Sequence, residues 1–298
     1  MQKRLMLNIL LLVLFSFPLA AEAKLKVVAT LPTLGALARE LGGDLVSVTT
    51  LATNGEDPHF VSPRPDYVLK LSRADLLIYN GMELEIGWLP PVQKNARNRR
   101  TMEGGPGLLD ASKVVTPLAV PRGQLSRAQG DVHGEGNPHY LYSLPEVRLV
   151  ARAISEKLRA LDPDHSAQYA DLLSTFEQKA AAKEAFWQSK FQALSAADKR
   201  LVSYHDSFIY LTHWLDLKQV ATVEPLPGVA PGPAHVKKLV AELKAAPVKY
   251  IIQENYQPRP VSQKIAAIVG AKVVIIDPGP GAGESYLAYL DRTLKEFF

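Results

Sequence analysis

Three histidines lie in short polar or proline-marked segments that are far apart in the chain. They are His59 in an Asp-Pro-His segment, His139 in an Asn-Pro-His segment and His205 in a Tyr-His-Asp segment. A carboxylate, Asp277, follows the apolar run 273–276. Imidazole nitrogens and carboxylate oxygens are the ligands of Zn²⁺ and related transition metals. The sequence has no HExxH or CxxC motif, so the fold itself must bring these side chains together.

Two of these residues directly follow predicted strands. His205 comes after the apolar strand 201–204, and Asp277 ends the strand 272–276. Ligands of open parallel sheets collect at the carboxyl ends of the strands. Because His59 and His139 belong to the first half of the chain, a metal held by all four residues would lie in a cleft between two lobes.

Other side chains are weaker candidates. Glu254, also at a predicted strand end, is the alternative carboxylate. His133 stands in the glycine-rich stretch 130–136, which we interpret as a mobile loop making at most transient metal contacts. Ordering such a segment costs conformational entropy and offers few ligands. We therefore expect the loop 123–136 to be dispensable for high-affinity binding.

The N-terminus reads as an export signal. A basic start precedes the mostly apolar stretch 5–19, and Ala-Glu-Ala at 21–23 fits a cleavage site, so residues 1–23 are predicted to be a signal peptide. About fifteen apolar residues are too few for a membrane-spanning helix, which needs roughly twenty. We expect the remaining chain to work outside the cytoplasm.

Composition narrows the class of protein and its compartment. The absence of cysteine excludes disulfides, thiolate ligands and a lipidated cysteine, which favours the periplasm over a lipid-anchored surface location. The net charge of +4 with no long basic run argues against nucleic acid as a partner.

Apolar strand and helix patterns alternate in both halves of the chain, which predicts α/β lobes with parallel sheets. The predicted strands are 25–30, 45–51, 75–79, 113–116, 200–204, 219–223, 248–253 and 272–276. The predicted helices are 33–41, 65–72, 234–245, 260–269 and 285–297. We could not assign the irregular segment 95–107.

The middle of the chain is helical. Ser143 and Glu146 form a capping-box signature ahead of a helix that runs to about Leu161. A second helical pattern, 164–194, contains no glycine or proline and would span roughly 46 Å. The predicted organisation is an N-terminal lobe (24–161), a long linking helix (162–196) and a C-terminal lobe (197–298).

These segments resemble one known family, the extracytoplasmic metal-binding solute-binding proteins of ATP-driven zinc and manganese importers. The segments that carry the resemblance are Asp57–His59 with Pro63, Asn137–His139, Tyr204–Tyr210, Val223–Pro225 and Asp277–Pro278. The resemblance implies two similar lobes joined by one long helix, with one metal between them. It places the ligands at His59, His139, His205 and Asp277.

The resemblance predicts a periplasmic monomer that captures Zn²⁺ and delivers it to its partner, an ABC-type membrane permease. Zinc-type members share the histidine at the third ligand position, although their histidine-rich loop is reduced here to 123–136 with one histidine. Mn²⁺ or iron is the alternative cargo. A secreted zinc hydrolase, with Glu254 or Asp206 as the base, and a binder of organic ligands on the same fold are the rival hypotheses.

Overall fold

The structure is a computed structural model that describes residues 23–121, 123 and 130–298. Apart from its last residue, Ala23, the predicted signal peptide lies outside the described residues. Within the described part of the chain, no helix is both long and apolar enough to cross a membrane.

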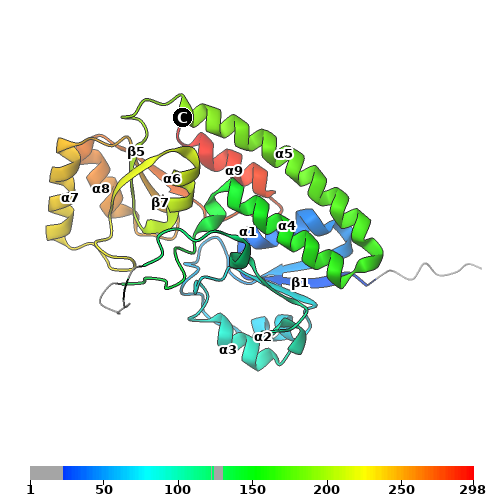
Figure 1. The fold of residues 1–298 in the computed structure, drawn as a ribbon. Helices are drawn as coiled ribbons and strands as arrows, with labels where there is room; N and C mark the ends of the chain where they lie inside the picture. Colours follow the sequence, from blue (N-terminus) through cyan, green and yellow to red (C-terminus); the bar gives the residue numbers. More distant parts are fainter. Residues whose placement is uncertain (1–22, 122, 124–129) are drawn as a thin grey trace, which may run out of the picture.

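Two four-stranded parallel sheets form the centres of the two lobes (Figure 1). Their strand orders are β2-β1-β3-β4 and β6-β5-β7-β8, so both sheets share one topology. The strands are β1 (Leu25–Ala29), β2 (Val46–Thr50), β3 (Leu76–Tyr79), β4 (Leu108–Asp110), β5 (Arg200–Ser203), β6 (Lys218–Thr222), β7 (Tyr250–Glu254) and β8 (Lys272–Ile276). All pairings within the sheets are parallel. The predicted fold class is confirmed.

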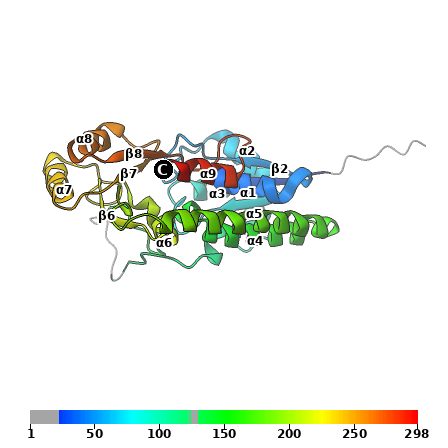
Figure 2. The same ribbon diagram turned by 90° about the horizontal axis from the view of Figure 1, so that it is seen from above.

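Helices cover both faces of the first sheet and flank the second (Figures 1 and 2). The α-helices of the described residues are α1 (Pro32–Gly42), α2 (Pro65–Ser72), α3 (Leu89–Ala96), α4 (Leu144–Leu161), α5 (Ser166–Gln192), α6 (Ile209–Leu215), α7 (Pro233–Ala245), α8 (Arg259–Val269) and α9 (Tyr286–Lys295). Helix α9 returns from the second sheet to pack on α1 and α5. The end of the chain therefore contributes to the N-terminal side of the molecule.

The long helix α5 links the two lobes. Its 27 residues span about 40 Å, and its buried side chains recur at intervals of four and seven residues, which gives one continuous apolar stripe. These side chains are Tyr169, Phe176, Ala180, Trp187 and Phe191. Helix α5 lies beside α4 along the N-terminal lobe (Figure 2) and contacts α6 of the C-terminal lobe.

The main hydrophobic core extends across both lobes. The buried cluster that contains Val27 and Leu77 of the first sheet also contains Leu201 and Tyr250 of the second. A smaller cluster, which includes Ile251, fills the opposite face of the second sheet. The two sheets therefore share one core, and the candidate ligands are predicted at the carboxyl edges of these sheets.

Two local predictions were wrong. The fourth strand is at Leu108–Asp110 rather than 113–116, because Asp110 Oδ1 accepts hydrogen bonds from Ser112 N and Oγ and turns the chain into the 3₁₀-helix Ala111–Val114. Helix α4 begins at Leu144 as predicted, but the Ser143 hydroxyl is buried without a hydrogen-bond partner, so the capping box does not form. The segment 95–107, which could not be assigned from the sequence, begins in the last turn of α3. The prolines of this helix lie in its first turn, where they need not donate a backbone hydrogen bond.

Candidate metal site

The three predicted histidines converge between the lobes. The ring centroids of His59, His139 and His205 lie 5.1 to 5.7 Å apart, and one ligand nitrogen from each lies within 4.8 Å of the others. All three side chains are buried. The Nε2 atoms of His59 and His139 have no hydrogen-bond partner. Buried polar atoms are normally paired, so these nitrogens indicate a binding site for a ligand.

His59 is fixed by a turn of its own segment. Asp57 Oδ1 accepts hydrogen bonds from the backbone N–H of His59 (3.0 Å) and from its Nδ1 (2.7 Å). Trp88 Nε1 donates to the Pro58 carbonyl at 3.0 Å and holds the segment from the other side. With the proton on Nδ1, the lone pair of the neutral ring is on Nε2, which faces the other histidines.

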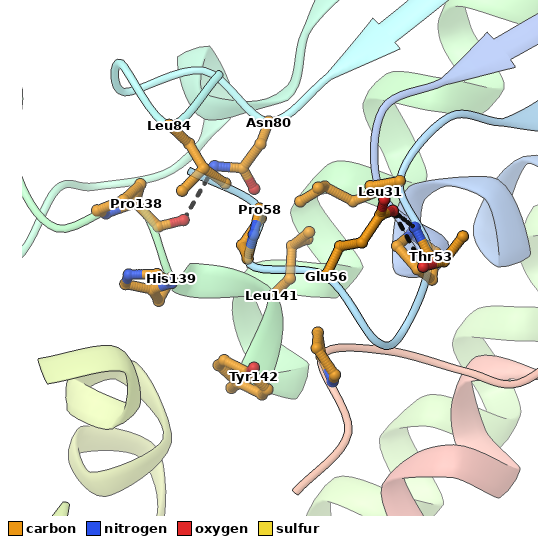
Figure 3. Close-up of a pocket in the computed structure, with 13 residues that line it drawn as sticks. Leu31, Thr53, Glu56, Pro58, Asn80, Leu84, Pro138, His139, Leu141 and Tyr142 are labelled. Carbon is orange, nitrogen blue, oxygen red and sulfur yellow. Dashed lines mark hydrogen bonds between the residues drawn. The ribbon is translucent and has the colours of Figure 1, made fainter. Parts of the chain in front are cut away.

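His139 is fixed by two asparagines. Its backbone N–H donates to Asn137 Oδ1 at 3.0 Å, and Asn80 Nδ2 donates to the Pro138 carbonyl at 2.9 Å (Figure 3). Asn137 Nδ2 donates to the Asp206 carbonyl at 2.7 Å, which ties the His139 loop to the turn after His205. The same loop thus contacts both lobes.

His205 is held from its own sheet. It follows β5, and Glu224 follows the adjacent strand β6, so both reach the same edge. Their side chains meet at 2.8 Å through His205 Nδ1 and Glu224 Oε2. A carboxylate on the second ring nitrogen orients a metal-ligating histidine and raises its basicity. Asp57 and Glu224 therefore play equivalent parts for His59 and His205.

The electrostatic environment differs among the three rings. Burial, reinforced by His59 and His205, holds the pKa of His139 well below its usual value. Burial also opposes protonation of His205, but the hydrogen bond to Glu224 and the nearby Glu254 carboxylate outweigh it, so the pKa of His205 is raised. Of these two rings, His139 is therefore the more readily available as a neutral ligand, and His205 is the more easily protonated.

The structure does not bring Asp277 to the three rings. Its Oδ1 accepts a hydrogen bond from Asn255 Nδ2 (2.6 Å), and its Oδ2 pairs with Arg292 of α9 (2.8 Å). Glu254 is fully buried, its Oε2 has no hydrogen-bond partner, and burial raises its pKa. As a ligand, Asp277 stays a prediction.

The segment 130–136 lies over the histidine cluster. The His133 ring stacks on His59 with centroids 5.3 Å apart, and His59, Asp131 and His133 form a second group of potential ligand atoms within 4.8 Å. Burial and the neighbouring His59 lower the pKa of His133 to about 4. Apart from the histidine itself, no sequence pattern indicates this position.

Two cavities adjoin the cluster. One of about 390 Å³ reaches His59, His205, Asp131 and Glu224. A smaller one of about 30 Å³ lies behind His139 and is lined mostly by apolar side chains, among them Leu141 (Figure 3). The larger cavity gives small solutes access to the cluster on the side of Asp131, and the smaller cavity has mostly apolar walls on the side of His139.

Comparison with known proteins identifies the family to which this chain belongs. The family described as "Zinc-uptake complex component A periplasmic" matches residues 27–297. The chain belongs to this family. The predicted resemblance is confirmed, and the family is one of solute-binding transport proteins rather than enzymes, as expected.

Relatives named for zinc and relatives named for manganese are about equally similar to this chain. The zinc-binding lipoprotein AdcA of Streptococcus pneumoniae is 27% identical over 92% of this chain, which spans only 55% of AdcA. The manganese ABC transporter substrate-binding lipoprotein PsaA of Streptococcus pneumoniae is 26% identical, over 92% of this chain and 88% of PsaA. Identity at this level does not separate the two metals.

Solved structures show the same fold. A zinc-bound ZnuA deletion mutant superposes with a TM-score of 0.75 and 26% identity, covering 92% of this chain and 95% of that one. The Mn-bound periplasmic metal-binding protein of Candidatus Liberibacter asiaticus gives 0.74 and 21% identity, covering 93% and 100%.

Glu224 offers a test of how the site is oriented. We expect Glu224→Gln to weaken metal binding by about 10- to 100-fold, because the amide neither fixes the His205 tautomer nor supports its basicity as a carboxylate does. A competitive titration with a chromophoric chelator measures this. Glu242→Gln on the exposed surface of α7 is the control, and an unchanged affinity in Glu224→Gln would show that the His205 contact is dispensable.

Proposed function

We propose that this protein captures Zn²⁺ outside the cytoplasm and delivers it to an ABC-type membrane permease. The observation that supports this most directly is the buried cluster of His59, His139 and His205, two of which hold unpartnered Nε2 atoms. A solute-binding protein needs a site that encloses its cargo between two lobes, and these residues come from loops of both lobes.

The donor set favours zinc over manganese. Three neutral imidazoles suit a tetrahedral Zn²⁺ with bonds of ~2.0–2.1 Å, whereas Mn²⁺ prefers more oxygen ligands and binds mixed sites less tightly. The family is also described by its role in zinc uptake. Other relatives are named for manganese, which is the competing cargo.

A carboxylate oxygen is proposed for the fourth position. Asp277 reaches the ion only by exchanging its contacts with Arg292 and Asn255 for the metal. Glu254, with a free buried oxygen and a favourable electrostatic interaction with His205, is the alternative. A fourth protein ligand leaves no metal-bound water to attack a substrate, which is consistent with an ion carried as cargo.

The periplasm is the compartment that we propose. The predicted signal peptide, residues 1–23, supports a location outside the cytoplasm. A permease is the partner, and we propose that a single chain presents one ion to it.

Metal competition tests the proposal. Protein purified without added metal and dialysed against equal Zn²⁺ and Mn²⁺ should retain zinc in a 1:1 ratio, because raw affinity and geometry both favour it. Retention of manganese would make this a manganese receptor. X-ray absorption of the zinc form should show three nitrogens and one oxygen, and Asp277→Asn and Glu254→Gln, compared in parallel, identify which carboxylate supplies the oxygen.

A further inference from the structure

A strained turn joins β3 to α3 in the N-terminal lobe. Met82 and Glu83 adopt positive φ values of 48° and 62°, directly after Gly81 at 81°. Residues other than glycine are strained in this left-handed region, and the strain persists only where the surrounding contacts fix the backbone. Two consecutive residues of this kind need a contact that holds the turn, and the side chain of Glu85 supplies it.

The Glu85 carboxylate is a buried acceptor for the start of this turn. The residue is only 3% exposed. Its Oε1 accepts hydrogen bonds from Thr30 Oγ1 at 2.6 Å and Asn80 N at 2.7 Å, and its Oε2 accepts from Gly81 N at 3.1 Å. Burial raises the pKa of this carboxyl group to about 7, while the three hydrogen bonds act in the opposite direction. All three partners are donors, which suits a carboxylate with its acceptor-only oxygens and does not suit an amide.

Asn80 connects Glu85 to the segment that carries His139. Its Nδ2 donates to the Pro138 carbonyl at 2.9 Å (Figure 3), and its own carbonyl accepts a hydrogen bond from the Tyr140 hydroxyl. The residues on both sides of His139 are therefore attached to one asparagine, whose backbone N–H is held by Glu85. The unpartnered Nε2 of His139 owes its position to this chain of contacts.

The same turn also reaches the segment of His59. The Glu85 carbonyl accepts hydrogen bonds from Trp88 N at 3.1 Å and Leu89 N at 2.9 Å, and Trp88 Nε1 donates to the Pro58 carbonyl. The turn around Glu85 therefore supports both histidine segments of the N-terminal lobe. Ligands that are held in place before the ion arrives lose less conformational entropy on binding, which raises affinity.

We propose that Glu85 is a positioning residue of the metal site: as a buried acceptor it fixes Asn80, and through Asn80 it fixes His139 in the orientation that binds the ion. This inference rests on the proposed function, because it assigns a supporting residue to the same metal site. Glu85 acts on binding only through other residues. An acceptor that merely stabilised the lobe would change the free energy of unfolding and leave the coordination of the ion as it is.

Glu85→Gln tests the proposal in the full chain. The substitution replaces one acceptor oxygen by an NH₂ group, so that at least one of the three donors faces another donor. Chelator competition should show Zn²⁺ bound at least about tenfold more weakly, as for other residues that orient metal ligands. Glu40→Gln is the matched control, because Glu40 of α1 is a part-buried carboxylate that accepts a hydrogen bond from Tyr286 N at 2.6 Å. The control should keep the affinity of the parent, and the same affinity in a folded Glu85→Gln protein would overturn the proposal.

Coupling to His139 separates positioning from general destabilisation. In a His139→Ala background, Glu85→Gln should change Zn²⁺ affinity by less than about threefold, because the ring that Glu85 positions is absent and the two effects are not additive. Glu224→Gln, which acts on His205, should keep its full effect in that background. An effect of Glu85→Gln that is equally large with and without His139 would overturn the proposal.

The visible absorption of bound Co²⁺ reports the coordination of the ion. At saturating Co²⁺, the spectrum of Glu85→Gln should shift toward that of His139→Ala, whereas Glu40→Gln should keep the spectrum of the parent. A parent spectrum in Glu85→Gln would show that the carboxylate does not position a ligand.

Asn80→Ala tests the same connection if Glu85→Gln does not fold. It keeps the backbone N–H that Glu85 holds and removes the side-chain donor to the Pro138 carbonyl. Zn²⁺ affinity should fall at least about tenfold, and an unchanged affinity would overturn the proposal. Failure of the parent chain to bind Zn²⁺ would instead refute the proposed function.

Discussion

His139→Ala is expected to lower zinc affinity by at least about a thousandfold, equivalent to ~4 kcal/mol, while the metal-free protein stays folded. His139 is buried with an unpartnered Nε2, and burial lowers its pKa and so keeps its ring neutral. This nitrogen can therefore bind the ion without giving up a proton or a hydrogen bond. The variant removes one side chain that would bind the metal directly, and changes to residues that merely orient a ligand already lower metal affinity by 10- to 100-fold.

Chelator competition measures the affinity, and thermal unfolding supplies the control. Zinc at a thousand times its dissociation constant stabilises the parent by ~4.1 kcal/mol; this increment should disappear in the variant, whereas the metal-free melting temperatures should remain similar. His213→Ala, an exposed histidine of α6, is the matched control. A His139→Ala protein that still gains the full zinc increment would show that the three-histidine cluster is not the binding site.

The convergence of the three histidines was predictable because parallel sheets bring strand ends to one edge. His205 directly follows β5, and the loop with His59 follows β2, so chain direction alone placed them near the same cleft. The carboxylate that orients His205 was also within reach of such reasoning, since Glu224 follows the strand next to β5. We did not draw that conclusion from the sequence.

The surroundings of Asp277 depend on tertiary packing that the sequence does not reveal. Helix α9 folds back over α1 and α5, and this places Arg292 beside Asp277, fifteen residues away along the chain. A strand-end carboxylate followed by proline looks the same whether it faces a metal or an arginine. The direction in which α9 leaves the second sheet decides whether the Asp277 carboxylate lies beside an arginine.

The position of the segment 130–136 also depends on tertiary packing. Glycine-rich composition predicts conformational freedom, but the anchors of this segment, Pro227 and Glu83, are remote in sequence. Its glycines allow the close backbone approach at Pro227. Local composition thus indicated a loop correctly, and only long-range contacts could show that it covers the metal site.

Zinc binding should weaken progressively as the pH falls, and protonation of His205 should contribute to this loss before protonation of His139. The pKa of this ring is raised, because the hydrogen bond to Glu224 and the nearby Glu254 carboxylate outweigh the effect of burial. A proton on His205 competes with the ion, so the contribution of this ligand is complete above its raised pKa and is lost below it, at about tenfold in affinity per pH unit. His139, whose pKa burial holds well below its usual value, joins the competition only in stronger acid.

Equilibrium dialysis at fixed free zinc from pH 8 to 4 measures this dependence. Glu224→Gln removes the hydrogen bond that favours the protonated ring, so its decline should begin at a lower pH than that of the parent, from a lower affinity at pH 8. The two curves should therefore converge in acid, because the carboxylate strengthens both the bound proton and the bound metal. Occupancy that stays constant down to about pH 4 in the parent would rule out a site made of imidazoles with ordinary competition by protons, and identical pH midpoints in the two proteins would show that Glu224 does not control the His205 ring.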